Sequence, residues 1–134
     1  MMTITEKLKT SGLKPTAQRV AILRALQGCE HPRVEEVYHA VRADSTTISF
    51  ATVYKALRAF GDAGLIRAIT TGENIIRYDC NPKPHYHCTC RLCGRVWDIF
   101  ENADGIAQML GQADGFFVDA ADVVFSGHCD GCAS

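Results

Sequence analysis

The sequence contains no long apolar segment, no internal repeat and no low-complexity tract. No apolar run approaches the roughly 20 residues that a membrane-spanning helix needs, so we expect no membrane partner. Residues 1–10 are polar, carry Glu6, Lys7 and Lys9, and include no apolar core of a secretory signal. These absences predict a cytoplasmic protein, in which seven cysteines indicate metal or redox chemistry rather than disulfides.

Signatures of metal-dependent enzymes are also missing. A zinc deaminase needs a His-x-Glu motif and a Pro before its Cys-x-x-Cys pair, but no His here is followed two residues later by Glu, and Thr89 precedes Cys90. The His-Glu-x-x-His helix of metallohydrolases is absent, and no nucleophile is paired with a base. We therefore do not expect an enzyme.

The net charge of −1 conceals a mild asymmetry along the 134 residues. Residues 1–80 hold 11 Lys and Arg against 8 Asp and Glu, whereas residues 81–134 hold 3 against 7. This distribution fits an anion-binding first part and an acidic second part, but it does not by itself establish nucleic-acid binding. The length suits one ordinary domain or two small ones.

Helical patterns dominate the first half of the chain. Four helices are predicted, over residues 3–11, over 16–28, after Pro32, and over 49–63. Thr16 and Ser49 are the expected N-caps of the second and fourth helices. In the third and fourth helices, apolar residues recur at i, i+3, i+4 and i+7, which predicts one buried stripe on each.

A hairpin is predicted to follow the helices. Its strands cover residues 65–70 and 75–79, joined by 71–74. Four helices and a hairpin within about 80 residues are the element order of a winged helix-turn-helix, in which the 49–63 helix would be presented to DNA. Ordinary amphipathic helices without a DNA-binding role are the alternative interpretation of the same pattern.

The segment Asn81-Pro82-Lys83-Pro84 predicts a domain boundary, because two prolines in four residues cannot continue a helix or a central strand. We therefore divide the chain into a winged-helix DNA-binding domain (1–80), a hinge (81–84) and a small α/β domain (85–134). In the last part we expect strands over 85–89 and 95–100, a helix over 103–110 and a strand over 116–125. The predicted fold class is α+β.

Two Cys-x-x-Cys pairs, Cys90/Cys93 and Cys129/Cys132, lie in the last third of the chain. Gly94 allows the tight turn that brings the first two sulfurs to one ion. Four thiolates in two pairs match tetrahedral Zn²⁺, so we predict a structural zinc site. The alternative, two redox pairs of the thioredoxin kind, is disfavoured because neither pair lies between a strand and a following helix of a βαβ unit.

A second group of metal-binding residue types surrounds the boundary. His85 and His87 lie two apart on a predicted strand and therefore face the same side. Imidazoles together with carboxylates suit Fe²⁺, Mn²⁺ or Zn²⁺. His31, Asp79 and Asp98 are further donors, but the spacing alone does not assign them to the same ion, and each taken singly reads as a surface His or an N-capping Asp.

Several segments together resemble one known family over nearly the full length of the chain. They are 12–16 with Arg19, 31–38, 51–57 (Ala-Thr-Val-Tyr-Lys-Ala-Leu), 64–66, 77–79, His85-Tyr86-His87, both Cys pairs and 127–129. The chain resembles the ferric uptake regulator (Fur) family of bacterial metal-dependent repressors. The resemblance implies a homodimer with an N-terminal winged helix, a C-terminal α/β dimerisation domain, and metal-gated binding of double-stranded operator DNA.

Within that family, the second metal site is most similar to that of the peroxide-sensing PerR branch. The resemblance implies a regulatory Fe²⁺ or Mn²⁺ held by His31, Asp79, His85, His87 and Asp98. It also implies that peroxide acts through Fe²⁺-catalysed oxidation of His31 or His85, whereas Mn²⁺ would support repression without peroxide sensing. Iron-uptake members usually carry Glu at the position of Asp98.

The alternative is an iron- or zinc-uptake repressor of the same family that uses the metal simply as a corepressor. Zinc-uptake members usually place a Cys in this site, and Cys80 neighbours Asp79, so zinc sensing stays open. An adaptor stapled by zinc, without DNA binding, is a further alternative.

The resemblance and the 49–63 helix together predict the DNA contacts. Tyr54 would pack on a thymine methyl, and Lys55 and Arg58 would reach phosphates or guanine edges, although half-buried packing is the alternative for Tyr54. The full predicted set is Lys14, Thr16, Arg19, Ser49, Thr52, Tyr54, Lys55 and Arg58. Cys29, Cys80 and His128 have no predicted role, and Cys88, opposite the two histidines on its strand, is expected to be a core thiol.

Overall fold

The computed structural model describes residues 2–71, 74–81, 85–100, 115 and 123–133. The chain forms two compact units, the first comprising Met1–Thr70 and Ile75–Pro82, the second Thr71–Asn74 and Lys83–Ser134. Among the described residues, no helix combines the length and the apolar character that crossing a bilayer requires.

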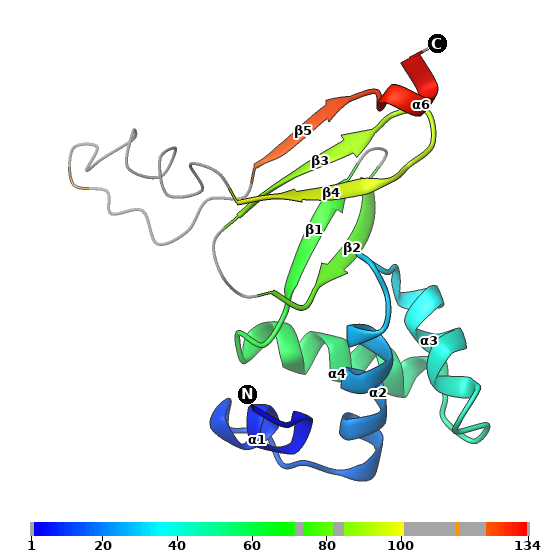
Figure 1. Ribbon diagram of the computed structural model, residues 1–134. Helices are drawn as coiled ribbons and strands as arrows, with labels where there is room; N and C mark the ends of the chain where they lie inside the picture. The colour runs from blue at the N-terminus through cyan, green and yellow to red at the C-terminus, as the bar shows by residue number, and fades with distance from the viewer. Residues whose placement is uncertain (1, 72–73, 82–84, 101–114, 116–122, 134) are drawn as a thin grey trace. The chain divides into compact units, whose positions relative to one another are not determined.

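The first unit contains four helices, α1 (Ile4–Thr10), α2 (Ala17–Gln27), α3 (Val34–Arg42) and α4 (Phe50–Asp62) (Figure 1). The N-termini of α1, α2 and α4 are fixed locally, since Thr3, Thr16 and Ser49 each accept a hydrogen bond from the backbone N–H three residues later. Such a cap replaces a bond that the first helical turn cannot make internally. The helices α1, α2 and α4 begin and end within about two residues of the predicted positions, and α3 begins after Pro32 as predicted.

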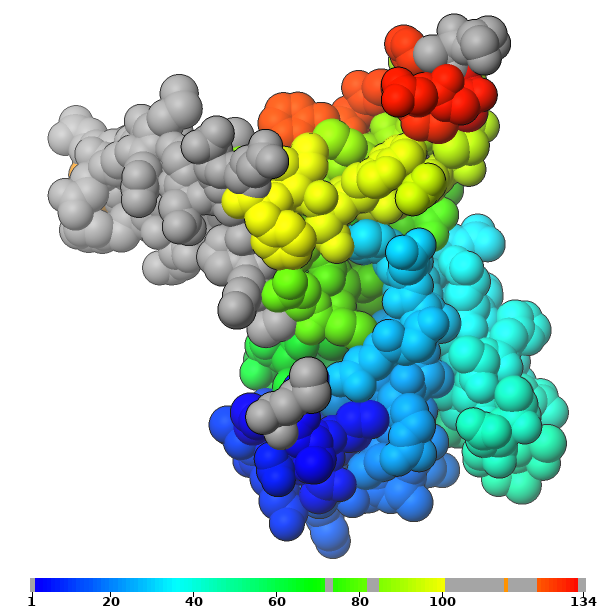
Figure 2. All heavy atoms as spheres, in the orientation of Figure 1, coloured from blue at the N-terminus to red at the C-terminus, as the bar shows by residue number. Residues whose placement is uncertain are grey.

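The core of the first unit is made of one stripe from each helix. Figure 2 shows α1 (dark blue) and α3 (cyan) on either side of α2. The fully buried side chains include Leu8 of α1, Leu26 of α2, Val37 of α3 and Phe60 of α4. On α4 the stripe of Val53, Ala56, Leu57 and Phe60 is buried. The opposite side of this helix is therefore left to solvent.

A two-stranded hairpin, β1 (Arg67–Thr71) and β2 (Ile75–Asp79), follows α4. Gly64 adopts φ +77° just after α4, a left-handed conformation that lets the chain leave the helix. The N–H of Tyr78 in β2 donates to the carbonyl of Pro32 at 2.9 Å, which ties the hairpin to the start of α3. The order of four helices and a hairpin confirms the predicted winged-helix arrangement.

The described residues of the second unit include a three-stranded sheet in the order β4-β3-β5. Its strands are β3 (Tyr86–Cys90), β4 (Val96–Ile99) and β5 (Val124–Gly127), and a short helix, α6 (Asp130–Ala133), follows. β3 pairs antiparallel with β4 and parallel with β5. Helices and small sheets together confirm the predicted α+β class.

The strand predictions for this unit agree with the structure where they can be compared. Strands predicted over 85–89 and 95–100 match β3 and β4. The helix predicted over 103–110 lies outside the described residues. Of the strand predicted over 116–125 only the end is described, and it continues beyond the predicted limit to Gly127. The short helix α6 was not predicted.

Candidate metal centres and nucleic-acid interface

The four cysteines of the two pairs form one cluster in the second unit. Cys90 ends β3, Cys93 lies in the turn after it, and Cys129 and Cys132 lie beside and within α6. Their four sulfur atoms all lie within 4.8 Å of one another, and the Cys93 and Cys129 sulfurs are 3.9 Å apart. Tetrahedral Zn²⁺ with Zn–S bonds of about 2.3 Å requires sulfurs about 3.8 Å apart. The cluster therefore fits a zinc ion.

The protonation of this cluster is uneven. Hydrogen bonds from the backbone N–H groups of Cys93 and Cys129 lower the pKa of Cys90 to about 6. Hydrogen bonds to the Cys129 and Cys90 sulfurs raise the pKa of Cys132 to about 12. Binding of zinc by four thiolates must therefore release at least the Cys132 proton.

In the first unit, His31 and Asp79 form a pair. The His31 Nε2 and Asp79 Oδ2 atoms are 3.9 Å apart, and Asp79 is 6% exposed. His31 has φ +43°, a left-handed conformation that a non-glycine residue adopts at a cost. The Arg77 guanidinium holds this conformation by donating to the His31 carbonyl at 2.9 Å. The N–H of Asn81 donates to the Asp79 carboxylate at 2.8 Å, which orients it.

In the second unit, Asp98 meets both histidines of the His-x-His motif. Its Oδ1 atom lies 3.1 Å from His85 Nε2 and 3.3 Å from His87 Nε2. The cause is the sheet register, which places His87 opposite Asp98 across β3 and β4. The histidines are only 2% and 3% exposed, and their ring centroids are 4.6 Å apart. The prediction that they face the same side is confirmed.

These donor sets have the spacing of metal ligands. Two atoms bound to one ion at about 2.1 Å lie about 3.0–4.2 Å apart for bond angles between 90° and 180°. The three distances of 3.1, 3.3 and 3.9 Å fall in this range. Imidazole and carboxylate donors fit Fe²⁺ and Mn²⁺. The first unit supplies two of the five predicted ligands, and the second unit supplies three.

A basic groove lies along α4 in the first unit, with a volume of about 410 Å³. The residues that line it include three cations and no carboxylate. They are Lys14, Thr16, Gln18, Arg19, Ile22, Thr52, Lys55, Ala56 and Ala59. We call this surface the basic groove.

Five of the eight predicted DNA-contacting residues line the basic groove, while Ser49, Tyr54 and Arg58 lie elsewhere on α4 or at its cap. All three of these residues are exposed. Tyr54 is 47% exposed, so its ring is accessible to a ligand. Ser49 caps α4, and its hydroxyl lies 2.8 Å from that of Thr52.

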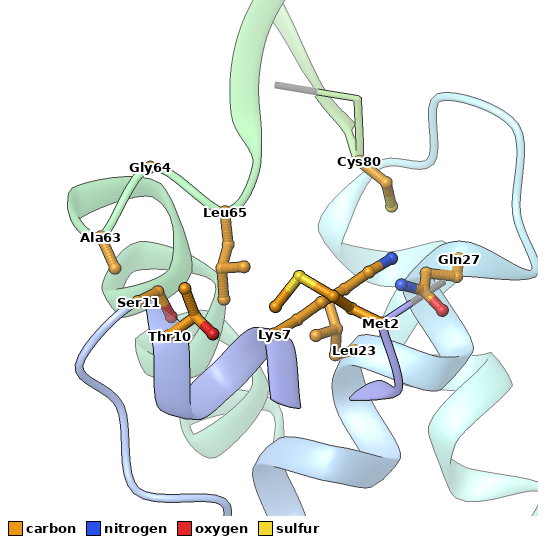
Figure 3. Close-up of a pocket in the computed structure, with 10 residues that line it drawn as sticks. All are labelled: Met2, Lys7, Thr10, Ser11, Leu23, Gln27, Ala63, Gly64, Leu65 and Cys80. Atoms are coloured by element: carbon orange, nitrogen blue, oxygen red, sulfur yellow. The ribbon is translucent and has the colours of Figure 1, made fainter. Parts of the chain in front are cut away.

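Two of the unassigned cysteines are shielded in the first unit. Burial raises the pKa of Cys29, whose sulfur donates to the Ala25 carbonyl at 3.2 Å. Burial also raises the pKa of Cys80 to about 11. In Figure 3 the Cys80 sulfur points into a cavity of about 280 Å³, on the side where the Lys7 side chain ends. Because the thiolate is the reactive form, these two thiols are poorly suited to a redox switch.

The prediction for Cys88 is wrong. Every other residue of β3 is buried, but Cys88 is only partly buried. The register places it between Trp97 of β4 and Phe125 of β5, and Phe125 is 48% exposed. This face of the sheet is thus only partly covered by the described residues. His128 is exposed next to the cysteine cluster.

Two supporting residues were missed by the sequence prediction of the sites. Arg77 holds the His31 backbone, and Phe100 stacks on the His85 ring with centroids 4.8 Å apart. The period-2 alternation of a strand was the available signal, since Arg77 precedes Asp79 by two residues and Phe100 follows Asp98 by two. Alternation indicates the face of the strand on which a side chain lies, but it does not indicate which residue that side chain contacts.

Comparisons with known proteins agree on one family. The model of the Ferric uptake regulator family matches residues 10–125. The peroxide operon regulator of Bacillus subtilis is 34% identical over 130 residues, covering 96% of this chain and 90% of that protein.

Two solved structures resemble the whole chain. The peroxide stress regulator of Campylobacter jejuni is 31% identical with a TM-score of 0.77, covering 98% of this chain and 100% of that one. The ferric uptake regulator from Pseudomonas aeruginosa with manganese is 27% identical with a TM-score of 0.77, covering 96% and 99%.

Proposed function

Because the chain belongs to the ferric uptake regulator family, whose members are DNA-binding transcriptional regulators and not enzymes, we propose that it is a cytoplasmic metal-dependent repressor that senses peroxide. The observation that carries this proposal is the contact of Asp98 with both buried histidines, His85 and His87. An Asp at this position, with imidazole partners, is the donor set of the peroxide-sensing branch. The regulators from Bacillus subtilis and Campylobacter jejuni, both named for peroxide, support it.

The proposed metal site draws on both units. His31 and Asp79 come from the DNA-binding domain (1–80), and the other three ligands come from the dimerisation domain (85–134). An ion held by both would fix the hinge at 81–84. In a homodimer, the two α4 helices must be held at a spacing set by the DNA repeat of about 34 Å. The ligands thereby couple metal binding to operator binding, and DNA must tighten metal binding in return.

The signal would reach DNA through loss of a ligand. When bound, Fe²⁺ supplies the electrons with which peroxide is converted into an oxidant of nearby side chains. A histidine that gains oxygen on its ring is a poor donor, so His31 or His85 would no longer hold its half of the site. The two domains would then move independently, and the recognition helices would lose their spacing.

The second candidate is a zinc- or iron-uptake repressor, and Cys80 beside Asp79 is the observation that favours zinc. The position of Cys80 weighs against a role as a zinc ligand. Its sulfur lines the cavity of Figure 3, and none of the five proposed regulatory ligands lines that cavity. For the peroxide-sensing version, an Asp98→Glu variant that kept its full peroxide response would count strongly against the role of Asp98.

The proposal is tested by metal-dependent DNA binding. A duplex is first selected from a random library with manganese-loaded, zinc-containing protein, and its affinity is then measured by fluorescence anisotropy during a Mn²⁺ titration. We expect His87→Ala to abolish the response to Mn²⁺ while the zinc content stays the same. The matched control is His39→Ala, which removes an exposed histidine of α3 and should respond as the wild type does. A normal response of His87→Ala would refute the proposed regulatory site.

A further inference from the structure

The first residue of α4, Phe50, is an aromatic side chain that is 43% exposed. The stripe that packs α4 into the core does not include it. It belongs to none of the metal donor groups, and it does not line the basic groove. A large apolar side chain at this position therefore has no role in the zinc site, the regulatory ligands or the phosphate contacts proposed above.

The Phe50 ring is nevertheless held in place. It packs on the edge of Tyr38 of α3, with ring centroids 5.5 Å apart and an interplanar angle of 73°, a favoured geometry for aromatic pairs. Tyr38 is itself fixed by Arg42, one turn later on α3. The Arg42 guanidinium lies 5.5 Å from the centre of the Tyr38 ring, and its Nη1 atom donates to the Tyr38 hydroxyl at 2.6 Å. We call Tyr38, Arg42 and Phe50 the aromatic clamp.

The aromatic clamp and the basic groove lie on opposite edges of α4. Successive helical residues turn by about 100°. Relative to Phe50, the groove residues Thr52 and Ala59 then lie about 160–180° away. Phe50 and Tyr54, one turn apart, share the other edge. The exposed ridge between the two edges carries Ala51 and Arg58, and Lys55 lies on the groove side of it. Cations therefore flank the ridge, Arg42 in the aromatic clamp and Lys55 in the basic groove.

This arrangement suits a helix that enters the major groove of DNA. The N-terminal residues of a recognition helix are those that approach base edges. A phenyl ring has no hydrogen-bonding group, and the C5-methyl of thymine is the apolar group that a base pair presents in the major groove. Of the base edges in that groove, Phe50 therefore has one apolar partner, the thymine methyl.

We propose that Phe50 is a specificity-determining residue that packs on a thymine methyl in the operator, and that Tyr38 and Arg42 are positioning residues that aim its ring. This inference rests on the proposed DNA-binding function and deepens it. Tyr54, on the same edge, is expected to contact a different base, because one helical turn separates the two side chains by about 5.4 Å along the axis.

The experiment replaces thymines singly with deoxyuridine, which lacks only the methyl group. The probe is the duplex selected above, and the protein is the full chain loaded with zinc and Mn²⁺. Burial of one such group is worth about 0.8 kcal/mol, which corresponds to about a fourfold change in affinity. At one thymine position in each half-site, replacement with deoxyuridine should lower the affinity of the wild type about fourfold. Phe50→Ala should bind the duplex with thymine and the duplex with deoxyuridine at that position equally well.

Two further variants separate aiming from folding. In Tyr38→Ala the ring of Phe50 is no longer oriented, so replacing that thymine with deoxyuridine should lower the affinity less than it does in the wild type. The response of this variant to Mn²⁺ should persist. The matched control is Leu92→Ala, which removes a 69% exposed apolar side chain in the second unit and should keep the wild-type thymine profile. Circular dichroism would confirm that each variant is folded.

The outcomes distinguish this inference from the function on which it rests. A Phe50→Ala variant with the wild-type thymine profile would overturn the inference and leave the repressor function standing. Equal affinity of Phe50→Ala and wild type for every duplex would overturn it too, and would point to a protein partner for the aromatic clamp. Failure of the wild type to select any duplex in the presence of Mn²⁺ would overturn both.

Discussion

Neutralising the basic groove should change how DNA binding depends on salt. The perturbation is the triple variant Lys14→Gln, Arg19→Gln and Lys55→Gln, which removes all three cations that line the groove and keeps side chains of similar length. No carboxylate lines the groove to neutralise these cations. When the complex forms, each of these cations that neutralises one phosphate releases the counterions condensed on that phosphate.

The magnitude follows from the number of contacts. Each neutralised phosphate contributes about −0.9 to the slope of log affinity against log salt concentration, so three contacts contribute about −2.7 for each chain. Raising the salt concentration from 50 to 200 mM should therefore weaken binding by the wild type about 40-fold more than binding by the variant, for each bound chain. The assay is fluorescence anisotropy with the selected duplex and saturating Mn²⁺ over that range of salt.

A control of equal charge change separates the groove from the overall charge of the protein. The variant Lys9→Gln, Arg24→Gln and Arg91→Gln also removes three positive charges, from exposed positions that do not line the groove. It should keep a slope close to that of the wild type, because only cations that meet a phosphate release condensed counterions. Equal slopes for the groove variant and the wild type would refute the assignment of the groove to DNA phosphates.

Three other predictions concern stability and zinc. Cys93→Ser should lose the zinc ion and melt at a lower temperature, and a full zinc content by atomic absorption would contradict the four-thiolate site. Phe60→Ala, at a fully buried position, should lower the free energy of unfolding by about 3–5 kcal/mol in urea, and a loss below about 1 kcal/mol would contradict the core. The pKa of Cys80 is about 11 in the folded chain, compared with 9.0 for an ordinary thiol, so the folded state keeps a proton that the unfolded state loses between these values. The free energy of unfolding should therefore fall as pH rises across this window, and it should fall less steeply in Cys80→Ala. Parallel pH profiles for the two proteins would contradict the burial of Cys80.

The sequence predicted most of the secondary structure because its signals are local. Thr16 and Ser49 mark helix starts through hydrogen bonds to residues three positions later, and such bonds can be anticipated from the chain itself. The two Cys-x-x-Cys pairs predicted that the four cysteines form one cluster, because four thiols with this spacing are typical of a tetrahedral zinc site. The His-x-His motif predicted a shared side because strand alternation is fixed.

Long-range contacts could not be predicted in the same way. The position of Asp98 opposite His87 depends on the register of two strands, which no single motif specifies. The left-handed conformation of His31 depends on Arg77, 46 residues away in sequence. Cys88 was misjudged because alternation gives the face of a strand and says nothing about what covers that face.

The most direct test of peroxide sensing is the intact and peptide mass of protein loaded with Fe²⁺ without oxygen, before and after a brief peroxide pulse, with operator affinity measured on the same samples. Protein loaded with Mn²⁺ is the control. We predict one added oxygen on the peptide that carries His31 or His85, with loss of operator binding, in the iron-loaded sample alone. Unmodified histidines and undiminished binding would contradict peroxide sensing and leave an uptake repressor of the same fold.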